Sequence, residues 1–287
     1  MNKSRLDDAT DQISIAVLMA CHNRARVTKS FFDSIEISRS DKFNFRFYVT
    51  DDGSSDDTKS VLESHSFPIK ITQGDGNLFW AKAMAKAEES IDHLHDGILW
   101  VNDDLKLFAD AFENLFNCIK SHPNAVLVGQ VVRFNTTRVI YGGYKSKSAH
   151  PLRLSLLNGT QSEDPDTFNG NFVYIPMEVR LAVGPINSFY YHAYADCDYG
   201  YRVRQLGYQI KLIPNFIGEG QTNTQPKFTN KWQQLKFFYN KKNNRLRDQI
   251  YFLTRFTKLR YMLLIPIFLA TPFVKIIVTK KKQVSDD

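Results

Sequence analysis

Strand-like and helix-like segments alternate four times between residues 13 and 121, and this pattern constrains the fold more than any other feature of the chain. Apolar, strand-like runs begin near Ile13, Phe43, Ile69 and Gly97, and each is followed by residues with helical spacing of apolar side chains. Repeated units of this kind connect through βαβ crossovers. After about residue 124 the alternation loosens, with helices expected over 177–184 and 196–207. We therefore expect an α/β fold with a mainly parallel central sheet flanked by helices.

Polar side chains follow three of the four predicted strands, at the point where each strand ends. They are His22 and Asn23, then Asp51 and Asp52, then the run 102–104. In open α/β sheets the ligand site is the crevice beyond the carboxyl ends of the strands, so we expect these groups to lie together. Neither G-x-G-x-x-G nor G-x-x-x-x-G-K-[ST] occurs in the sequence, which argues against dinucleotide binding and a P-loop.

Asp103 and Asp104 are adjacent carboxylates directly after the apolar run 98–101. Carboxylates side by side repel each other and resist burial, so they persist where a cation or a catalytic role stabilises them. A second interpretation is that one of them caps the helix expected to follow. The neighbouring strand-end acids favour a binding site, because a helix cap needs no such neighbours.

The positive charge of the chain is concentrated at its C-terminal end. Residues 225–287 contain 14 Lys and Arg against 3 Asp, whereas the whole chain has a net charge of +7. A run of 14 uncharged residues, Tyr261–Val274, is shorter than the roughly 20 residues that span a bilayer, and two prolines interrupt it. We therefore expect a basic, amphipathic C-terminal helical extension rather than a transmembrane helix.

This extension has the composition of a helix that lies on an anionic membrane surface, with apolar side chains among acyl chains and Lys and Arg at the headgroups. The alternative is packing on the chain's own domain or on a second copy, which would make a homodimer. No base-reading motif accompanies the charge, so nucleic acid is not an expected partner.

The three cysteines, Cys21, Cys118 and Cys197, are far apart and form no C-x-x-C pair. Their spacing argues against a zinc site or a disulfide framework and is typical of a reducing compartment. The first eleven residues precede the first apolar run and contain three Asp, which does not fit a secretory signal. We expect a cytoplasmic protein that is peripheral at the inner face of the cell membrane.

Four stretches carry a family resemblance: "SIAVLMACHNR", "YVTDDGSSDDT", "WVNDDL" and "YADCDYGYRVRQLG". In this order they resemble the opening strand, the Asp-Asp-Gly-Ser corner, the Asp-x-Asp metal motif and the catalytic-base segment of family 2 glycosyltransferases with the GT-A fold. A fifth stretch, "GNLFWAKAM", resembles a loop of a subset that includes rhamnosyltransferases of polysaccharide synthesis. The likeness covers residues 13 to about 220.

The resemblance implies a Rossmann-like GT-A domain that inverts the sugar configuration during transfer from a UDP-, dTDP- or GDP-linked donor. It implies nucleotide binding by the first two corners with help from the third, Mg²⁺ or Mn²⁺ on Asp104 as the cofactor, and Asp196 as the general base. The implied nucleotide-binding residues are Ala20, His22, Asp51, Asp52 and Asp103.

Five further residues are candidates for contacts with the donor sugar or the acceptor, and each has a structural alternative. Trp80 stacks on a sugar or belongs to the core, and Gly170 with Asn171 lines the acceptor pocket or shapes a turn. Asp198 is near a helix start and contacts the ligand or caps the helix. Arg202 contacts the ligand or forms an ion pair with a neighbouring carboxylate.

The chain departs from the family pattern at three places. Asn102 stands where the metal motif begins with Asp, and Ala195 stands where Glu precedes the base. The segment after the base helix has no His that could help to bind metal, although Glu219 could substitute. These departures keep open an inactive fold that serves as a membrane or complex partner.

The sequence thus predicts an inverting glycosyltransferase that acts on a glycan or lipid-linked acceptor in cell-surface polysaccharide biosynthesis. A nucleotidyltransferase is the other enzymatic alternative, because it would also use a metal-binding carboxylate crevice on an α/β sheet. We expect the GT-A domain over residues 1–224, with nucleotide binding over about 13–123 and acceptor binding over about 124–224. Residues 225–287 form the extension.

Overall fold

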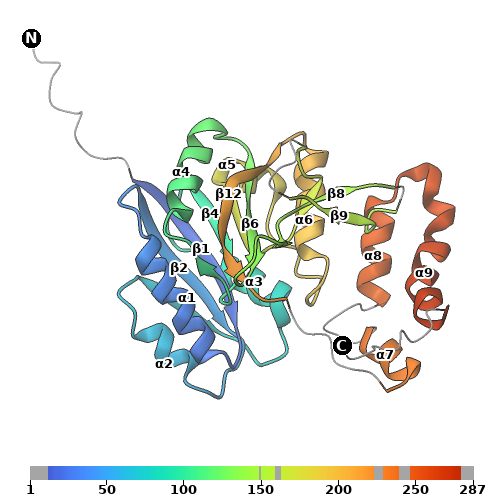
Figure 1. Cartoon of the computed structure of the whole chain (residues 1–287), viewed down its shortest axis with the longest axis horizontal. Coiled ribbons are helices and arrows are strands. Elements are labelled where there is room, and N and C mark those ends of the chain that lie inside the picture. The colour runs from blue at the N-terminus through green and yellow to red at the C-terminus, as the bar shows by residue number, and fades with distance from the viewer. Residues whose placement is uncertain (1–11, 149, 159–162, 223–228, 239–245, 279–287) are drawn as a thin grey trace, which may run out of the picture.

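A computed structural model of the chain describes residues 12–148, 150–158, 163–222, 229–238 and 246–278. Over these residues it has a central nine-stranded sheet, a small three-stranded sheet and helices on both faces of the central sheet (Figure 1). The strands are β1 (Ile13–Cys21), β2 (Phe43–Asp51), β3 (Ile69–Gln73), β4 (Gly97–Val101), β5 (Lys106–Leu107), β6 (Val126–Arg133), β7 (Val139–Tyr141), β8 (Gly143–Ser146), β9 (Leu154–Leu156), β10 (Thr167–Phe168), β11 (Phe172–Pro176) and β12 (Ile210–Gly220).

The helices over the described residues follow the predicted alternation in the first half of the chain and continue beyond it to the C-terminal end. They are α1 (Ala25–Ser38), α2 (Thr58–Glu63), α3 (Phe79–Glu89), α4 (Ala111–Ser121), α5 (Met177–Val183), α6 (Ala195–Gln205), α7 (Lys231–Phe238), α8 (Leu246–Phe256), the 3₁₀ helix η1 (Leu259–Leu264) and α9 (Ile265–Val278). Helix α6 ends at Gln205, and the predicted C-terminal glycine, Gly207, follows it with a φ of +85°.

The strand order of the central sheet is β3-β2-β1-β4-β11-β6-β12-β5, and β7 pairs with β6. Strands β1 to β4 are parallel to their neighbours in this series, and β6 is parallel to β12. Strand β11 is antiparallel to both β4 and β6, so β6 and β12 run in the same direction as β4. The expectation of a mainly parallel sheet is therefore confirmed, with β11 inserted in the opposite direction.

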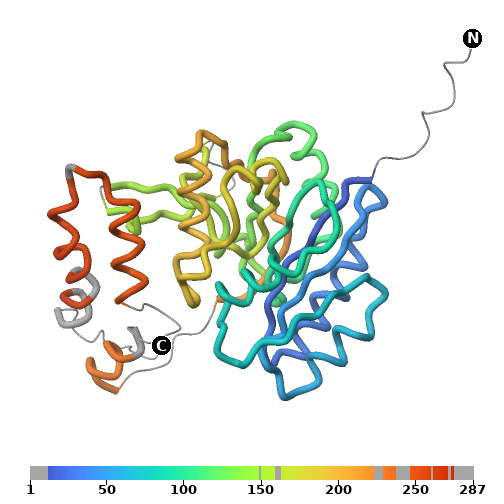
Figure 2. The backbone as a smooth tube through the Cα atoms, turned by 180° about the vertical axis from the view of Figure 1, so that it is seen from behind, coloured from blue at the N-terminus to red at the C-terminus, as the bar shows by residue number. Residues whose placement is uncertain are grey.

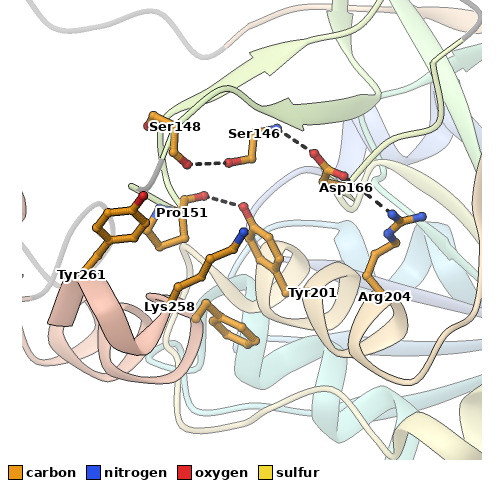
Figure 3. A pocket seen from close by; sticks show the side chains of 9 residues that line it. Ser146, Ser148, Pro151, Asp166, Tyr201, Arg204, Lys258 and Tyr261 are labelled. Carbon is orange, nitrogen blue, oxygen red and sulfur yellow. Dashed lines mark hydrogen bonds and ion pairs between the residues drawn. The ribbon is translucent and has the colours of Figure 1, made fainter.

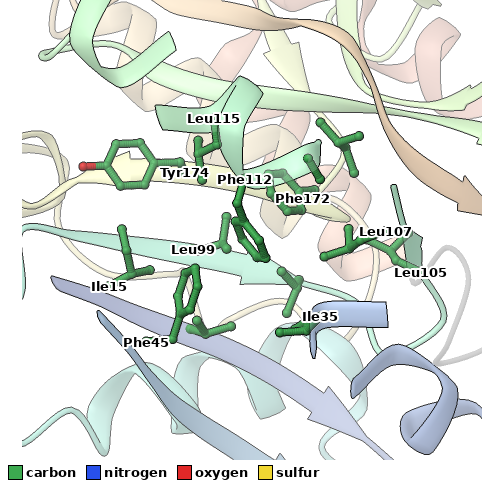
Figure 4. Close-up of a cluster of buried hydrophobic side chains, with 14 of the residues drawn as sticks. Ile15, Ile35, Phe45, Leu99, Leu105, Leu107, Phe112, Leu115, Phe172 and Tyr174 are labelled. Carbon is green, nitrogen blue, oxygen red and sulfur yellow. The ribbon is translucent and has the colours of Figure 1, made fainter. Parts of the chain in front are cut away.

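The alternation of side chains along each buried strand divides the core into two clusters on opposite faces of the sheet. Val17 and Leu99 face the cluster under α1, α2 and α4, which Figure 4 shows in part. Leu18 and Trp100 face the other cluster, under α3, α5, α6 and α8. Because β1 and β4 are covered on both faces, they read as continuous apolar runs rather than as an alternation of polar and apolar residues.

The segment after Asp104 differs from the sequence prediction. The short strand β5 pairs with β12 and separates Asp104 from helix α4, which begins at Ala111 with Asp110 as its N-cap residue. Neither Asp103 nor Asp104 caps a helix, so this alternative is wrong. The apolar pattern of the segment correctly predicted a helix. It could not show the six residues that precede the helix, of which Lys106 and Leu107 pair with a distant strand.

The C-terminal helices lie at one end of the molecule, next to α6 and the β8–β9 hairpin, whereas α1 and α2 lie at the other end (Figures 1 and 2). Helix α8 packs into the core of the main domain. Its Phe252 is fully buried and its ring contacts Tyr194 and Tyr201 of the α6 segment. Among the helices that the structure describes, none has the length and apolarity needed to cross a bilayer.

We expect Phe252→Ala to destabilise the whole domain, because it empties a fully buried site in the core. The expected loss in the free energy of unfolding is about 3–5 kcal/mol, measured by chemical denaturation. Ile250→Ala on the exposed side of the same helix is the matched control, with an expected loss of about 1 kcal/mol or less. Equal effects of the two substitutions would contradict the packing of α8 on the core.

Candidate functional site

The Asp52 carboxylate, directly after β2, organises the loop that leads into α3. Its Oδ1 accepts a hydrogen bond from the amide of Gly76 at 2.9 Å, and its Oδ2 accepts from the amides of Leu78 and Phe79 at 3.0 Å each. Three amide donors converge on one side chain that is only 5% exposed. Asp52 therefore holds the loop in place, which is more than the role of a turn residue in an Asp-Gly pair.

A pocket of about 250 Å³ lies between the ends of β1 and β2 and the beginning of α3. Its wall includes the predicted residues Ala20, His22, Asp52 and Trp80. The imidazole Nδ1 of His22 lies 2.6 Å from the carbonyl oxygen of Asp52, so the ring is fixed against the second corner. Asp51 is buried beside this pocket, where its carboxylate accepts a hydrogen bond from the Ser54 amide.

Arg24 links the first and third corners of the site. Its guanidinium lies 3.2 Å from the Asp103 carboxylate and 2.8 Å from that of Asp104. Asp103 is almost completely buried and also accepts a hydrogen bond from the hydroxyl of Thr28. Burial raises the pKa of Asp103 to about 6 although Arg24 acts in the opposite direction. Asp103 thus anchors Arg24 and α1 to the end of β4, and Asp104 is the more accessible carboxylate.

Asp104 has the chemistry of a ligand for a hard divalent cation. Its side chain is about a quarter exposed, and Mg²⁺ commonly takes one or two carboxylates together with phosphate oxygens. Among the described residues there is no group of three or more His, Cys, Asp or Glu side chains that could hold a metal ion. The suggested substitute Glu219 instead contacts Lys106 and the amide of Asn135. The donor set therefore fits a cation that also receives oxygens from a bound ligand.

A chain of side-chain hydrogen bonds connects the end of β4 with the beginning of α6. The indole N–H of Trp80 donates to Asn102 Oδ1 at 2.9 Å, and Asn102 Nδ2 donates to Asn171 Oδ1 at 2.6 Å. Asn171 in turn donates to Asn169, and Asn169 donates to Asp196 Oδ2 at 3.3 Å. Asn102 accepts at one end of its amide and donates at the other, which a carboxylate cannot do.

Asp196 lies at the end of this chain, in the first turn of α6. Its carboxylate also accepts hydrogen bonds from the amides of Gly170 and Cys197. Burial raises the pKa of Asp196 above its ordinary value, against the opposing effect of these hydrogen bonds. The preceding residue, Ala195, is fully buried, so a glutamate at this position would have to bury its charge.

Gly170 and Trp80 pack directly on each other beside Asp196. A Cβ atom on Gly170 would lie 2.6 Å from the Trp80 ring, so a larger residue does not fit without moving the indole. Trp80 also borders the pocket at the end of β1, and its ring contacts Trp100 in the core. The Trp80 indole therefore lines the pocket on one side and packs on Gly170, next to Asp196, on another. It belongs both to the site and to the core.

Asp198 and Arg202 bind each other on the inner side of α6. Asp198 is fully buried, and its Oδ1 lies 2.6 Å from Arg202 Nε. The hydroxyl of Tyr190 donates to the other oxygen, and Arg255 of α8 lies 3.6 Å from it. Arg202 also donates to the carbonyl oxygens of residues 183 and 185. In this structure both residues hold α6 against its neighbours, and neither lies in the wall of the pocket at the end of β1.

Three of the five non-glycine residues with a positive φ among the described residues lie around the site. Asn23, Phe79 and Tyr194 have φ values of +51°, +56° and +76°, a region that non-glycine residues rarely adopt. They stand, respectively, after β1, at the start of α3 and directly before α6. Strained residues of this kind persist where the surrounding contacts over-determine the backbone, and they cluster at functional sites.

Three residues of this site were not among the sequence predictions. Arg24 pairs with both acids, Asn169 contacts Asp196, and His192 lines the pocket beside Trp80. The corner "HNR" and the run "FNGNF" contained signals for the first two. The segment that contains His192 follows no predicted strand and carries no motif, so nothing in the sequence indicated its position.

Comparisons with known proteins bear on the family and the fold of this chain. The family model described as "Glycosyl transferase family 2" matches residues 16–178, more than half of the chain. A search of curated proteins found no match. Among solved structures, the mannosyltransferase PcManGT from Pyrobaculum calidifontis, in complex with GDP-Man and Mn²⁺, is 15% identical with a TM-score of 0.56, over 97% of this chain and 80% of that chain.

Two further structures are similar. Residues 1–349 of S. aureus TarS are 15% identical with a TM-score of 0.58, over 93% of this chain and 81% of that chain. GalNAc-T7 with UDP, GalNAc and Mn²⁺ is 13% identical with a TM-score of 0.59, over 91% of this chain and 58% of that chain. At such identities the likeness concerns the fold alone.

We expect Asp52→Ala to release the loop between β3 and α3, because three amides lose a charged acceptor. Amide hydrogen exchange of Gly76, Leu78 and Phe79 should accelerate by about tenfold or more, as each hydrogen bond to a charged group is worth about 1.5–3 kcal/mol. Asp75→Ala is the control, since its carboxylate accepts only from the amide of Asn77. Unchanged exchange in the Asp52 variant would show that the loop keeps its shape without this side chain.

Proposed function

Since this chain belongs to glycosyl transferase family 2 and has the GT-A fold, we propose that it moves a sugar from a nucleoside-diphosphate donor to an acceptor hydroxyl with inversion. The observation that supports this most is the arrangement at one edge of the sheet. The pocket at the ends of β1 and β2 is joined to the accessible carboxylate of Asp104 by Arg24. It is joined to Asp196, in the first turn of α6, by the hydrogen-bond chain that begins at Trp80.

The donor nucleotide occupies the pocket at the ends of β1 and β2. We assign the base and ribose to the side of Asp51 and Asp52. Asp52 lines the pocket and holds the loop beside it, and the buried Asp51 supports the corner through the Ser54 amide. Similar structures are complexes with GDP-Man, with UDP and with UDP-GlcNAc. UDP-, dTDP- and GDP-linked sugars are the donor classes that we propose for this chain.

Asp104 holds Mg²⁺ or Mn²⁺ in the working enzyme, with Asp103 and Arg24 fixing its position. Two of the similar structures are complexes with Mn²⁺, which supports a divalent cation here. Such a cation stabilises the negative charge that builds up on the leaving diphosphate. Because Arg24 binds the same carboxylate, its guanidinium has to share Asp104 or move aside when a cation is held.

Asp196 is the general base. It takes the proton of the acceptor hydroxyl while that oxygen attacks the anomeric carbon opposite the leaving diphosphate, and a single displacement inverts the configuration. The hydrogen bonds from Gly170 and Asn169 orient one carboxylate oxygen. The raised pKa makes the carboxylate a stronger base than an ordinary aspartate.

The acceptor is a glycan or a lipid-linked saccharide, and we place the reaction at a membrane surface in the synthesis of cell-surface polysaccharide. Leu259, Leu263 and Ile267 are largely exposed on η1 and the start of α9, in a region of the sequence with high positive charge. Exposed apolar side chains beside basic residues are suited to an anionic bilayer surface.

The alternative of an inactive fold rested on Asn102 and Ala195. Asn102 now has a role as the link between Trp80 and Asn171, and Ala195 occupies a fully buried position. Both departures are thus compatible with an active enzyme. No described feature favours a nucleotidyltransferase over transfer of a sugar.

Calorimetric titration with UDP, dTDP and GDP, each with and without Mn²⁺, tests the donor site. We expect one nucleotide to bind more tightly in the presence of Mn²⁺, and Asp104→Ala to weaken that binding by about tenfold or more, since it removes the proposed carboxylate ligand. Asp110→Ala, at the N-cap of α4, is the control that should bind as the parent does. Absence of binding for all three nucleotides would contradict the proposal.

Asp196→Asn tests the general base. We expect transfer to fall about 10²–10⁴-fold while nucleotide binding is retained, because an amide cannot accept the proton. In the parent, the transfer rate should fall as the pH is lowered through the pKa of Asp196, which lies above that of an ordinary aspartate because burial disfavours its charge. Asp164→Asn is the control. An Asp196→Asn enzyme as fast as the parent would exclude this role.

A further inference from the structure

A second cavity, of about 440 Å³, lies between α6, the β8–β9 hairpin and the segment that joins α8 to η1 (Figure 3). We name it the α6–η1 pocket. Helix α6 contributes Tyr201 and Arg204, and the segment after α8 contributes Lys258 and Tyr261. The remaining wall consists of Ser146, Ser148, Pro151, Asp166 and Phe256. None of these residues belongs to the pocket at the ends of β1 and β2.

The charges around this pocket favour an anion. The guanidinium of Arg204 has a distant partner, Asp166, at 4.0 Å. Asp166 is already engaged by Lys145 at 3.5 Å and by the amide of Ser146 at 3.0 Å. No acidic side chain among the described residues forms an ion pair with the exposed Lys258. Arg204 and Lys258 therefore bring two positive charges to the cavity. The Asp166 carboxylate in its wall is shared between Arg204 and a third cation, Lys145.

The remaining wall suits a polar headgroup. The hydroxyls of Ser146 and Ser148 lie on one side, and Tyr201 closes another side with its hydroxyl bound to the carbonyl oxygen of Pro151 at 2.6 Å. The rings of Tyr201 and Phe256 are stacked at 5.2 Å, which keeps the wall rigid. These hydroxyls already donate to backbone carbonyl oxygens, so Arg204 and Lys258 supply the charged donors that a phosphate group requires.

An apolar surface begins at the edge of the same pocket. Leu259 directly follows Lys258 and is 88% exposed, and Leu263 lies two residues beyond Tyr261 and is 92% exposed. Ile267, which is 61% exposed at the start of α9, adds a third exposed apolar side chain. A cationic cavity bordered by exposed apolar side chains matches a ligand that carries an anionic head and an apolar chain.

We propose that the α6–η1 pocket binds the phosphate of an amphiphilic phosphate monoester, with Arg204 and Lys258 as its cationic ligands and the apolar chain over Leu259 and Leu263. As an acceptor site this rests on the proposed function. Arg204 follows Asp196 by eight residues, or about 12 Å along the helix axis. That spacing leaves room for a saccharide that the amphiphile carries on an atom outside the phosphate, so that the phosphate stays a monoester while a sugar hydroxyl reaches the base.

Vesicle binding tests the proposal without any need for catalysis. The probes are phosphatidylcholine vesicles that contain phosphatidic acid, a phosphate monoester, or phosphatidylserine, which is anionic without a monoester. We expect the full chain to prefer phosphatidic acid, and Arg204→Gln with Lys258→Gln to weaken that binding about tenfold or more. Lys59→Gln, on the exposed side of α2, is the matched control and should bind as the parent does.

Two outcomes overturn the proposal. If the double variant binds phosphatidic acid as tightly as the parent, the pocket is not the site. If it loses phosphatidylserine binding to the same extent, the two cations act only through general attraction to a negative surface. A circular dichroism spectrum and thermal unfolding like those of the parent exclude misfolding of the variant.

Soluble glycerol 3-phosphate separates the two sources of a phosphate monoester. We expect it to compete poorly with phosphatidic acid vesicles, because it lacks the chain that contacts Leu259 and Leu263. Full competition at equal phosphate concentration would overturn the lipid part of the proposal in favour of a free phosphorylated sugar. Nucleotide titration of the same double variant should match the parent, so a failure at this pocket is distinguishable from a failure of the donor site.

Discussion

The hydrogen bonds of Asn102 hold together the parts of the site that different strands supply. Its amide oxygen accepts from Trp80, its amide nitrogen donates to Asn171, and its backbone N–H donates to the carbonyl oxygen of Asn171. Each hydrogen bond of this kind contributes about 0.5–1.5 kcal/mol net, so together they favour one arrangement of the half-buried Trp80 and Asn102. The position of Asp196 relative to the end of β4 depends on this arrangement through Asn169.

Much of the fold could be predicted from the sequence because its first half is built from local repeats. The strands β1 to β4 are buried on both faces, and their apolar runs, with helical spacing between them, sufficed to indicate a parallel sheet. The second half could not be predicted in the same way. Strand β11 lies between β4 and β6 although β6 precedes it in the chain, and β5 pairs with β12 more than a hundred residues later. No local pattern encodes such pairings.

The candidate site shows the same division. Strand-end position was enough to bring Asp52 and His22 to one pocket, whereas Trp80 of α3 was a candidate only as a residue that stacks on a sugar. The contacts of each side chain involve residues that are far away in the sequence, and the sequence alone could not show these contacts. Asp198 looks like a free acid near a helix start, yet its carboxylate meets the hydroxyl of Tyr190 and Arg255 of a later helix. Family resemblance supplied the proposed roles, and the structure supplied the contacts by which they can be tested.

The burial of Phe252 in the core has a consequence for the modularity of this chain. The C-terminal extension, rich in basic and aromatic residues, has the composition of an independent membrane anchor that could be exchanged between homologous chains. Helix α8 is nevertheless an integral part of the main domain, since Phe252 and Leu253 are fully buried. A chimera joined at residue 224 would have to rebuild that interface with foreign side chains. A junction in the turn after Phe256 would leave the α8 interface native and would replace η1 and α9, so that the contact to be rebuilt with the β8–β9 segment is that of Phe268 with His150.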